Sequence, residues 1–294
     1  MTEYIRKNIA IFFDCHGLEI INYINMNSKL HNYNARYISI NGYVKDKTIT
    51  KLNEKDIQCI SDADILILQV IEKDRGYLNN EEIIKYCKEN CIILKIPHYR
   101  NSVYEYRTIE EKYNKYDLIK NWQLPKKIKD LGDIEGTINI INNEINIMNN
   151  LVRDKDEMQK SLISKVNQFF QIDNLSDVKM LDYYKENYKK YRLFQGRSYP
   201  SSIFFYELTN RIMDKLNIPH NSPFVDNYFA DNTGEPIPNY WHIFCNFTFE
   251  NLFYTCEHIY ITEYEWYYIL LLSNNPNITH KAENMKFINK IRNK

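Results

Sequence analysis

The first 24 residues combine an apolar run, a short polar turn and a helical repeat. Residues 8–13, Asn-Ile-Ala-Ile-Phe-Phe, form an apolar run of strand length, which is typical of a strand buried on both faces. The turn follows at residues 14–17, Asp-Cys-His-Gly. Apolar residues then recur at near-helical spacing, at Leu18, Ile20, Ile21 and Ile24. A buried strand that leads through a tight turn into a helix is typical of a parallel α/β sheet, and we predict that fold class.

Three more predicted strands continue this alternation. They are residues 35–40, 64–70 and 91–96. Residues 79–90 lie between the last two and have a helical pattern, with Asn79 as the predicted N-cap and Glu82 in the capping-box position. Strands that alternate with helices favour a parallel sheet, whose ligands bind beyond the carboxyl ends of the strands. The loops expected there start at Asp14, Val70 and Pro97.

The second half of the chain is predominantly helical in pattern. Its predicted helices are residues 137–149, 154–170, 176–191 and 201–216. Residues 221–239 hold three prolines and a glycine, which predicts a loop, and a later helix is predicted with Thr262 and Glu265 at its start. We predict one α/β domain over residues 1–294. Its parts are a sheet-forming core (about 1–125), a helical portion (126–220) and an aromatic-rich C-terminal cap (221–294).

Charge and hydropathy exclude several classes of partner. The 38 basic and 38 acidic side chains cancel, so no overall field attracts nucleic acid. No run approaches the ~18 apolar residues of a membrane span, and the polar N-terminus lacks a signal-peptide core. We expect a cytoplasmic protein with no nucleic-acid partner and no membrane span.

Cysteine and glycine usage narrows the chemistry. The 6 cysteines include no Cys-x-x-Cys pair, so we predict neither a disulfide scaffold nor a metal site. Only 7 glycines occur, which makes each position more informative because glycine allows close approaches and backbone conformations that other residues do not. The glycines of interest are Gly17, Gly76 and Gly196.

Cys15 lies between the first strand and the first helix. The positive end of a helix dipole lowers the pKa of a thiol, so this position favours a thiolate nucleophile, with His16 as a neighbouring base. The alternative is a buried cysteine that packs as a small apolar residue.

Two more polar residues are predicted at the same edge of the sheet. Gln69 ends an apolar strand, and its amide is a candidate donor to an oxyanion; hydrogen bonding to the adjacent loop is the alternative. His98 follows the fourth strand with Arg100 close behind and is a second candidate general base. Arg197 and Ser198 precede a predicted helix and are candidates for holding a phosphate, although Ser198 has the plain alternative of a helix cap.

Several short segments, in this order, resemble the WcbI-type polysaccharide-biosynthesis acetyltransferases. The segments are Asp-Cys-His-Gly at 14–17, Ile-Leu-Ile-Leu-Gln at 65–69, Lys-Ile-Pro at 95–97, Tyr-Arg-Leu-Phe at 191–194 and Ser-Tyr-Pro at 198–200. The likeness runs from about Asn8 to Pro219, with a weaker continuation to about Ser273. It departs from the family at residues 14–16, where Asn-Cys-Gln is usual, and at Tyr199-Pro200, where the family has His-Pro.

The resemblance implies an SGNH/flavodoxin-like three-layer sandwich with a parallel sheet and a large helical C-terminal portion. It also implies the use of coenzyme A and acetylation of glycan sugars, with Cys15 in the position of a nucleophile elbow. If the family's histidine of the His-Pro pair is its base, another residue replaces it in this chain, and His16 is the first candidate.

We therefore predict an acetyl-CoA-dependent acetyltransferase that acts on an amino or hydroxyl group of a sugar or nucleotide-activated sugar. The predicted catalytic residues are Cys15, His16, Gln69 and His98. The predicted coenzyme contacts are Gly17, Lys73, Arg100, Arg197 and Ser198. An acetylated cysteine and direct transfer are both open. The alternatives are an SGNH-like esterase or sugar deacetylase, and an inactive binding module of the same fold.

Overall fold

The computed structural model describes most of the N-terminal part of the chain and shorter stretches of the rest. The described residues are 7–27, 33–46, 48–71, 74–104, 134–149, 154–194, 199–221, 224, 237, 239–249, 253–254 and 260–261. The chain forms two compact units. Unit 1 comprises Met1–Ser102 and Ser164–Thr233, and unit 2 comprises Val103–Ile163 and Gly234–Lys294. The single domain with three parts stays a prediction.

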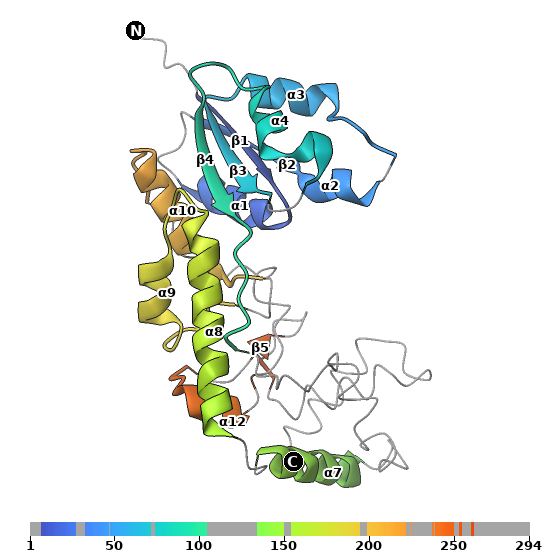
Figure 1. Ribbon diagram of the computed structural model, residues 1–294, viewed down its shortest axis with the longest axis vertical. Coiled ribbons are helices and arrows are strands. Elements are labelled where there is room, and N and C mark those ends of the chain that lie inside the picture. The colour runs from blue at the N-terminus through green and yellow to red at the C-terminus, as the bar shows by residue number, and fades with distance from the viewer. Residues whose placement is uncertain are drawn as a thin grey trace. The chain divides into compact units, whose positions relative to one another are not determined.

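Unit 1 contains a four-stranded sheet in the order β2-β1-β3-β4 (Figure 1). The strands are β1 (Lys7–Phe13), β2 (Tyr33–Ser39), β3 (Ile65–Val70) and β4 (Ile92–Pro97). All three pairings are parallel; in their register Ile9 lies opposite both Ala35 and Ile65. The parallel α/β sheet and its four strands are confirmed, each within two residues of its predicted bounds.

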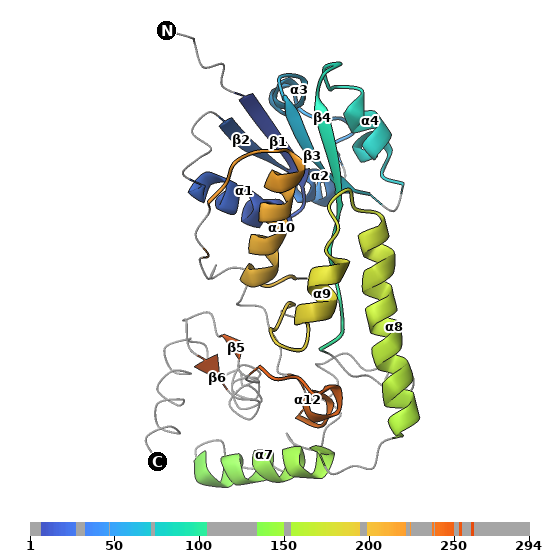
Figure 2. The ribbon, with the colours of Figure 1, turned by 90° about the vertical axis from the view of Figure 1, so that its left-hand side faces the viewer.

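Helices cover both faces of this sheet (Figures 1 and 2). Its central strands β1 and β3 are buried on both faces because nearly every side chain in them is apolar. One face packs on α1 (His16–Met26) and α10 (Ser202–Lys215), which contact each other. The other face carries α2 (Ile40–Lys45), α3 (Glu54–Ser61) and α4 (Asn80–Ile84), and its core includes Phe12, Leu66 and Leu68.

The helix predicted over residues 79–90 has Asn79 at its N-cap, as expected, but its predicted extent is wrong and no side-chain hydrogen bond caps it. The chain forms a 3-10 turn, η1 (Gly76–Leu78), and then α4 of only five residues. The side chain of Asn79 accepts from the backbone N–H of Arg75 at 2.7 Å instead of capping α4. After Ile84 the backbone continues in turns, with the N–H of Cys87 donating to the carbonyl of Ile84.

An aromatic cluster joins the helical part of unit 1. The ring of Phe169, on α8 (Lys155–Asn174), stacks on Tyr184 of α9 (Leu181–Asn187) with centroids 4.0 Å apart. The helix α9 starts at Leu181 and not at the predicted Ser176. The reason is local: the Ser176 hydroxyl hydrogen-bonds the backbone of Val178 and the Asp173 carboxylate accepts from the N–H of Met180, so side chains occupy backbone groups that a helix would use.

Unit 2 contains α7 (Ile134–Asn149), the first turns of α8, α12 (Asn239–Cys245) and the antiparallel pair β5 (Phe253–Tyr254) and β6 (Tyr260–Ile261). Its buried Trp241 donates from Nε1 to the carbonyl of Val103 at 2.8 Å. The helix predicted with Thr262 at its start lies outside the described residues. Among the residues that the structure describes, no helix has the length and apolar character of a membrane span.

Candidate active site

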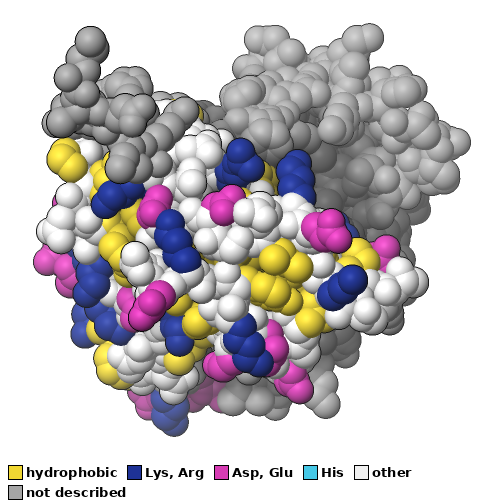
Figure 3. All heavy atoms as spheres, turned by 90° about the horizontal axis from the view of Figure 1, so that it is seen from above, with side chains coloured by type: hydrophobic (Ala, Val, Ile, Leu, Met, Phe, Trp, Pro, Cys, Tyr) yellow, Lys and Arg dark blue, Asp and Glu magenta, His cyan; other side chains and the backbone are white. Residues whose placement is uncertain are grey.

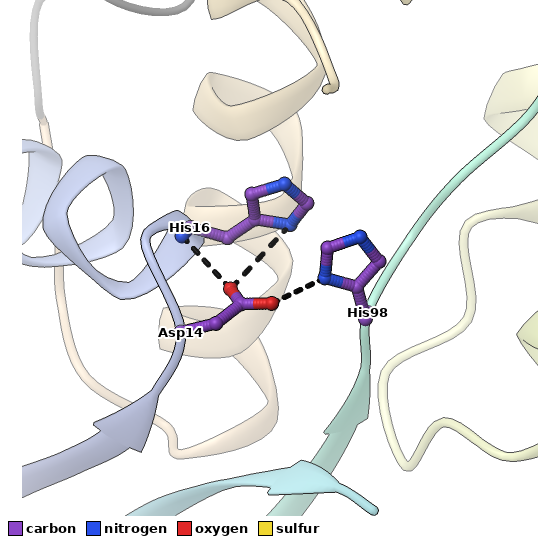
Figure 4. A group of neighbouring side chains, drawn as sticks. All are labelled: Asp14, His16 and His98. Atoms are coloured by element: carbon purple, nitrogen blue, oxygen red, sulfur yellow. Dashed lines mark hydrogen bonds and ion pairs between the residues drawn. The ribbon is translucent and has the colours of Figure 1, made fainter. Parts of the chain in front are cut away.

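Three polar residues from separate strands meet at the carboxyl edge of the sheet, where β1, β3 and β4 end. The backbone N–H of Asp14, just after β1, donates to Oε1 of Gln69 on β3 at 2.8 Å. Nδ1 of His98, just after β4, makes a short hydrogen bond with Oδ2 of Asp14. Because the strand order brings β1, β3 and β4 together, residues 84 positions apart in the sequence form one constellation (Figure 4).

Asp14 is the centre of this constellation. Its Oδ1 accepts from the backbone N–H of His16 at 2.9 Å and lies 4.0 Å from Nδ1 of that histidine. Its carbonyl accepts from the hydroxyl of Tyr37 at 2.6 Å. The carboxyl is buried, with 11% of the side chain exposed. The sequence analysis did not assign Asp14 a role; its place at the carboxyl end of a strand was the available signal.

The charges around Asp14 favour its ionised form. Burial by itself raises the pKa of this carboxyl, but the hydrogen bond from His98, the charge of His16 and the N–H of His16 together hold the pKa below its ordinary value. An ionised carboxylate only accepts hydrogen bonds, so Nδ1 of His98 carries the proton of that contact. Nε2 of the neutral imidazole is then the basic nitrogen.

The two histidines differ in exposure. His98 has 23% of its side chain exposed, whereas His16 has 2%. Their rings are stacked, with centroids 4.2 Å apart and 17° between the planes. The other sides of the His16 ring meet the edges of Tyr199 and Phe205. His98 is therefore placed to act on a ligand, and His16 packs behind it.

Asp14, His16 and His98 also bring three possible metal-ligand atoms within 4.8 Å of one another. A histidine nitrogen binds a metal along its lone pair, in the plane of the ring. Because the two rings are nearly parallel, their lone pairs do not converge on one ion unless a ring turns. The arrangement as it stands is that of a hydrogen-bonded Asp–His pair.

Cys15 differs from the expectation of an activated thiol. It lies at the N-cap of α1 and is half-buried. Burial raises the pKa of its thiol, and the negative charge of Asp14 and the weaker one of Glu19 add to this. The prediction of a lowered pKa is wrong because burial, which is the largest effect, and these carboxylates outweigh the helix end. Glu19 is buried in the first turn of α1, and its effect on the Cys15 thiol was not predicted from the sequence.

Gln69 is placed at the site, but its hydrogen bond is the one expected of a loop contact. Because the Asp14 N–H is a donor, the amide oxygen of Gln69 must face it, which leaves only Nε2 as a donor elsewhere. The contact of Gln69 with an oxyanion stays a prediction.

Gly17 is explained by close packing. A Cβ at this position would lie 2.5 Å from Cε2 of Tyr37 and 2.7 Å from Cβ of Phe13. Only glycine lets α1 approach the Tyr37 ring that holds the carbonyl of Asp14. A contact between Gly17 and a coenzyme stays a prediction.

A cleft of about 290 Å³ opens beside the Asp14–His98 pair. Its polar lining comprises Asp14, Asn41, Gln69, Arg75, His98 and Arg100, and its apolar lining comprises Ile40, Val44, Val70 and Ile71. Arg100, a predicted coenzyme contact, is thus at the cleft, and Arg75 is there without having been predicted. Lys73, Gly196, Arg197 and Ser198 lie outside the described residues.

No family model and no curated protein matches the chain. Its fold is similar to a solved structure of WcbI, which is described as a novel polysaccharide biosynthesis enzyme. That structure is of the native protein without a disulfide bond between coenzyme A and a cysteine. The TM-score is 0.59 over 97% of this chain and 94% of WcbI, at 12% sequence identity. At this identity the likeness shows a shared fold.

Proposed function

We propose that the protein is an acetyl-CoA-dependent acetyltransferase that acts on an amino or hydroxyl group of a sugar. The observation that carries the proposal is the Asp14–His98 pair, which presents a basic imidazole nitrogen beside a cleft at the carboxyl edge of the sheet. The fold shared with WcbI supports the choice of coenzyme, because the description of that structure mentions coenzyme A.

The transfer begins with the acceptor in the cleft. Nε2 of His98 takes the proton of the sugar hydroxyl or amine as its oxygen or nitrogen attacks the thioester carbonyl. The new bond to the acetyl carbon forms, the carbon–sulfur bond breaks, and the CoA sulfur leaves with the proton held on His98. Asp14 holds the imidazole in the required tautomer and stabilises its positive charge between these two proton transfers.

Direct transfer is the form of the reaction that the site supports better. A covalent route needs the thiolate of Cys15, and burial with the charge of Asp14 raises the pKa of this thiol. The buried Asp14 carboxylate instead stabilises a positive imidazole. In this account Cys15 shapes the site, and His98 is the base.

The proposal is tested by calorimetric titration of the protein with CoA and acetyl-CoA, followed by acetyl-CoA turnover with a panel of sugars and sugar phosphates. Binding at micromolar strength, about −8 kcal/mol, together with turnover that needs an acceptor supports a transferase. Hydrolysis of a simple acetyl ester without any coenzyme effect contradicts it and identifies an esterase or deacetylase that uses the same pair with water. Ligand binding with no turnover of any substrate identifies a binding module.

A further inference from the structure

We infer that the cleft beside His98 holds a phosphate of the acceptor, so that the acceptor is a sugar with a phosphate group close to the atom that is acetylated. The inference rests on the proposed function and deepens it. Arg75 and Arg100 line the same cleft as the base, and both are exposed to a ligand that enters it. The cleft lining includes two guanidinium groups and one carboxylate, Asp14, which is already hydrogen-bonded to His98, so the lining favours an anion.

The segment that carries Arg75 is fixed by its own hydrogen bonds. Oδ1 of Asp74 accepts from the N–H of Gly76 at 2.9 Å and from Nδ2 of Asn79 at 2.7 Å. Oδ1 of Asn79 in turn accepts from the N–H of Arg75 at 2.7 Å, and Gly76 has φ +59, which favours glycine. These bonds order the backbone on both sides of Arg75, which lowers the entropic cost of binding a ligand there.

A second set of bonds ties this segment to the strand that carries Gln69. Asn80, which is buried, donates from Nδ2 to the carbonyl of Gln69 at 2.7 Å and accepts from the N–H of Ile71 at 3.1 Å. The start of α4 is therefore joined to the wall of the cleft. These bonds fix the backbone near Arg75 relative to β3 and to the wall of the cleft beside His98.

The size of the cleft indicates whether the bound phosphate belongs to the acceptor sugar or to the coenzyme. A sphere of its volume, 290 Å³, is about 8 Å across. In extended CoA roughly 13 bonds, each advancing about 1.25 Å, place the diphosphate about 16 Å from the sulfur. A thioester at His98 therefore puts the diphosphate of the coenzyme well beyond the cleft. A phosphate on a sugar ring lies within a few bonds of the ring hydroxyls. It therefore fits in the cleft while a hydroxyl of the same ring lies at His98.

The apolar part of the lining suits the same ligand. Ile40, Val44, Val70 and Ile71 form a wall that can cover the C–H face of a sugar ring, while the arginines take its charge. A sugar 1-phosphate and a nucleoside diphosphate sugar both carry a phosphate on the sugar ring. Measuring the affinity of the protein for each distinguishes the two.

The test compares three variants that each remove one positive charge. Arg75→Gln and Arg100→Gln change the cleft, and Arg36→Gln is the matched control, because Arg36 is also exposed but lines a separate, smaller cavity with Asn8 and Asp62. Calorimetry measures the binding of glucose 1-phosphate, UDP-glucose, glucose and CoA to each. Circular dichroism verifies that the variants are folded.

We expect glucose 1-phosphate or UDP-glucose to bind the unmodified protein more tightly than glucose. We expect Arg75→Gln to weaken that binding by about tenfold or more, since a hydrogen bond to a charged group is lost, while CoA affinity changes less than about twofold. Arg36→Gln leaves both unchanged. The inference is overturned if neither phosphate ligand exceeds glucose, or if Arg75→Gln weakens CoA alone. Absence of CoA binding by the unmodified protein contradicts the proposed function instead, and the phosphate comparison still decides this inference.

Discussion

The two edges of the sheet in unit 1 use the same acidic residue type in opposite ways. At the amino edge, Asp64 accepts from the N–H of Asn8 at 2.7 Å and pairs with Lys88 at 2.6 Å, and the two side chains are 33% and 39% exposed. At the carboxyl edge, Asp14 is 11% exposed and pairs with His98. Each carboxylate joins two neighbouring segments of the sheet, but only one is buried.

The partner and the burial decide what each carboxylate can do. Burial is the largest single influence on Asp64 and raises its pKa, but the hydrogen bonds from Lys88 and the N–H of Asn8, with the charge of Lys88, together bring the pKa below its ordinary value. The ion pair between Asp64 and Lys88 is partly solvated, and its role is to join the segments before β3 and β4. Seen from above, the end of the unit where the strands begin carries charges of both signs around a hydrophobic patch (Figure 3). The partner at the other edge is an imidazole with one nitrogen bonded to Asp14 and part of its ring exposed beside a cleft, which makes that edge the candidate for catalysis.

The largest difference between the edges is expected in turnover. His98→Gln removes the base and lowers acetyl transfer by about 10²- to 10⁴-fold, whereas Lys88→Gln at the amino edge changes it less than about twofold. Release of free CoA from acetyl-CoA, followed in the presence of the acceptor, measures both. Equal rates for the two variants would remove the distinction between the edges.

The next largest effect is expected in the free energy of unfolding, when the close packing at the carboxyl edge is disturbed. Gly17→Ala places a methyl group against Tyr37 and Phe13 and lowers the free energy of unfolding by about 1–3 kcal/mol. Gly42→Ala is the matched control, because nothing lies within 4 Å of a Cβ there and its position in α2 favours alanine. Urea denaturation of both variants gives the comparison. A neutral Gly17→Ala would mean that Tyr37 is not held where Asp14 needs it.

A smaller difference between the two edges is expected in their contribution to stability at acid pH. The folded-state pKa of Asp14 lies below the ordinary 3.8, so its contribution to stability is present above about pH 4 and is lost as the pH falls through the folded-state pKa. Asp14→Asn should therefore flatten the acid side of the stability curve, measured by urea denaturation from neutral pH downward. Asp64→Asn should flatten it less, because that pair is solvated. The reverse order would contradict the difference in burial.

The smallest effect is expected at Cys15. Since burial and the charge of Asp14 raise the pKa of its thiol, Cys15→Ala should keep turnover within about fivefold of the unmodified protein. Alkylation of Cys15 by iodoacetamide, followed by peptide mass spectrometry, should be slow at neutral pH and accelerate in alkali. A loss of about 100-fold in Cys15→Ala, with an acetyl group found on the cysteine, would restore the covalent route.

The sequence predicted the sheet well because β1, β3 and β4 are mainly apolar runs of strand length, which are typical of buried strands. It predicted a helix start less well where side chains compete for backbone groups, as at Asp173 and Ser176 before α9. The short helices α2 and α3 were not predicted, since their few residues carry little periodic signal.

The site was predicted in place but not in its pairing. His98 and Cys15 were expected at the carboxyl edge from the strand ends, and they lie there. The role of Asp14 depends on the strand order, which sets a residue after β1 beside one after β4, and no local pattern contains that information. The thiol pKa of Cys15 was expected to fall because the helix end was considered without the burial of the thiol and without the carboxylates near it.

The central claim is that Asp14 holds His98 so that Nε2 is the basic nitrogen. Long-range ¹H–¹⁵N spectra of the full chain at about pH 8 report directly which imidazole nitrogen carries the proton, with His98→Gln providing the assignment. The account predicts the Nδ1-protonated tautomer of His98 and the loss of that preference in Asp14→Asn. Protonation at Nε2 in the unmodified protein would contradict it, because the histidine would then present a donor, and no base, to the cleft.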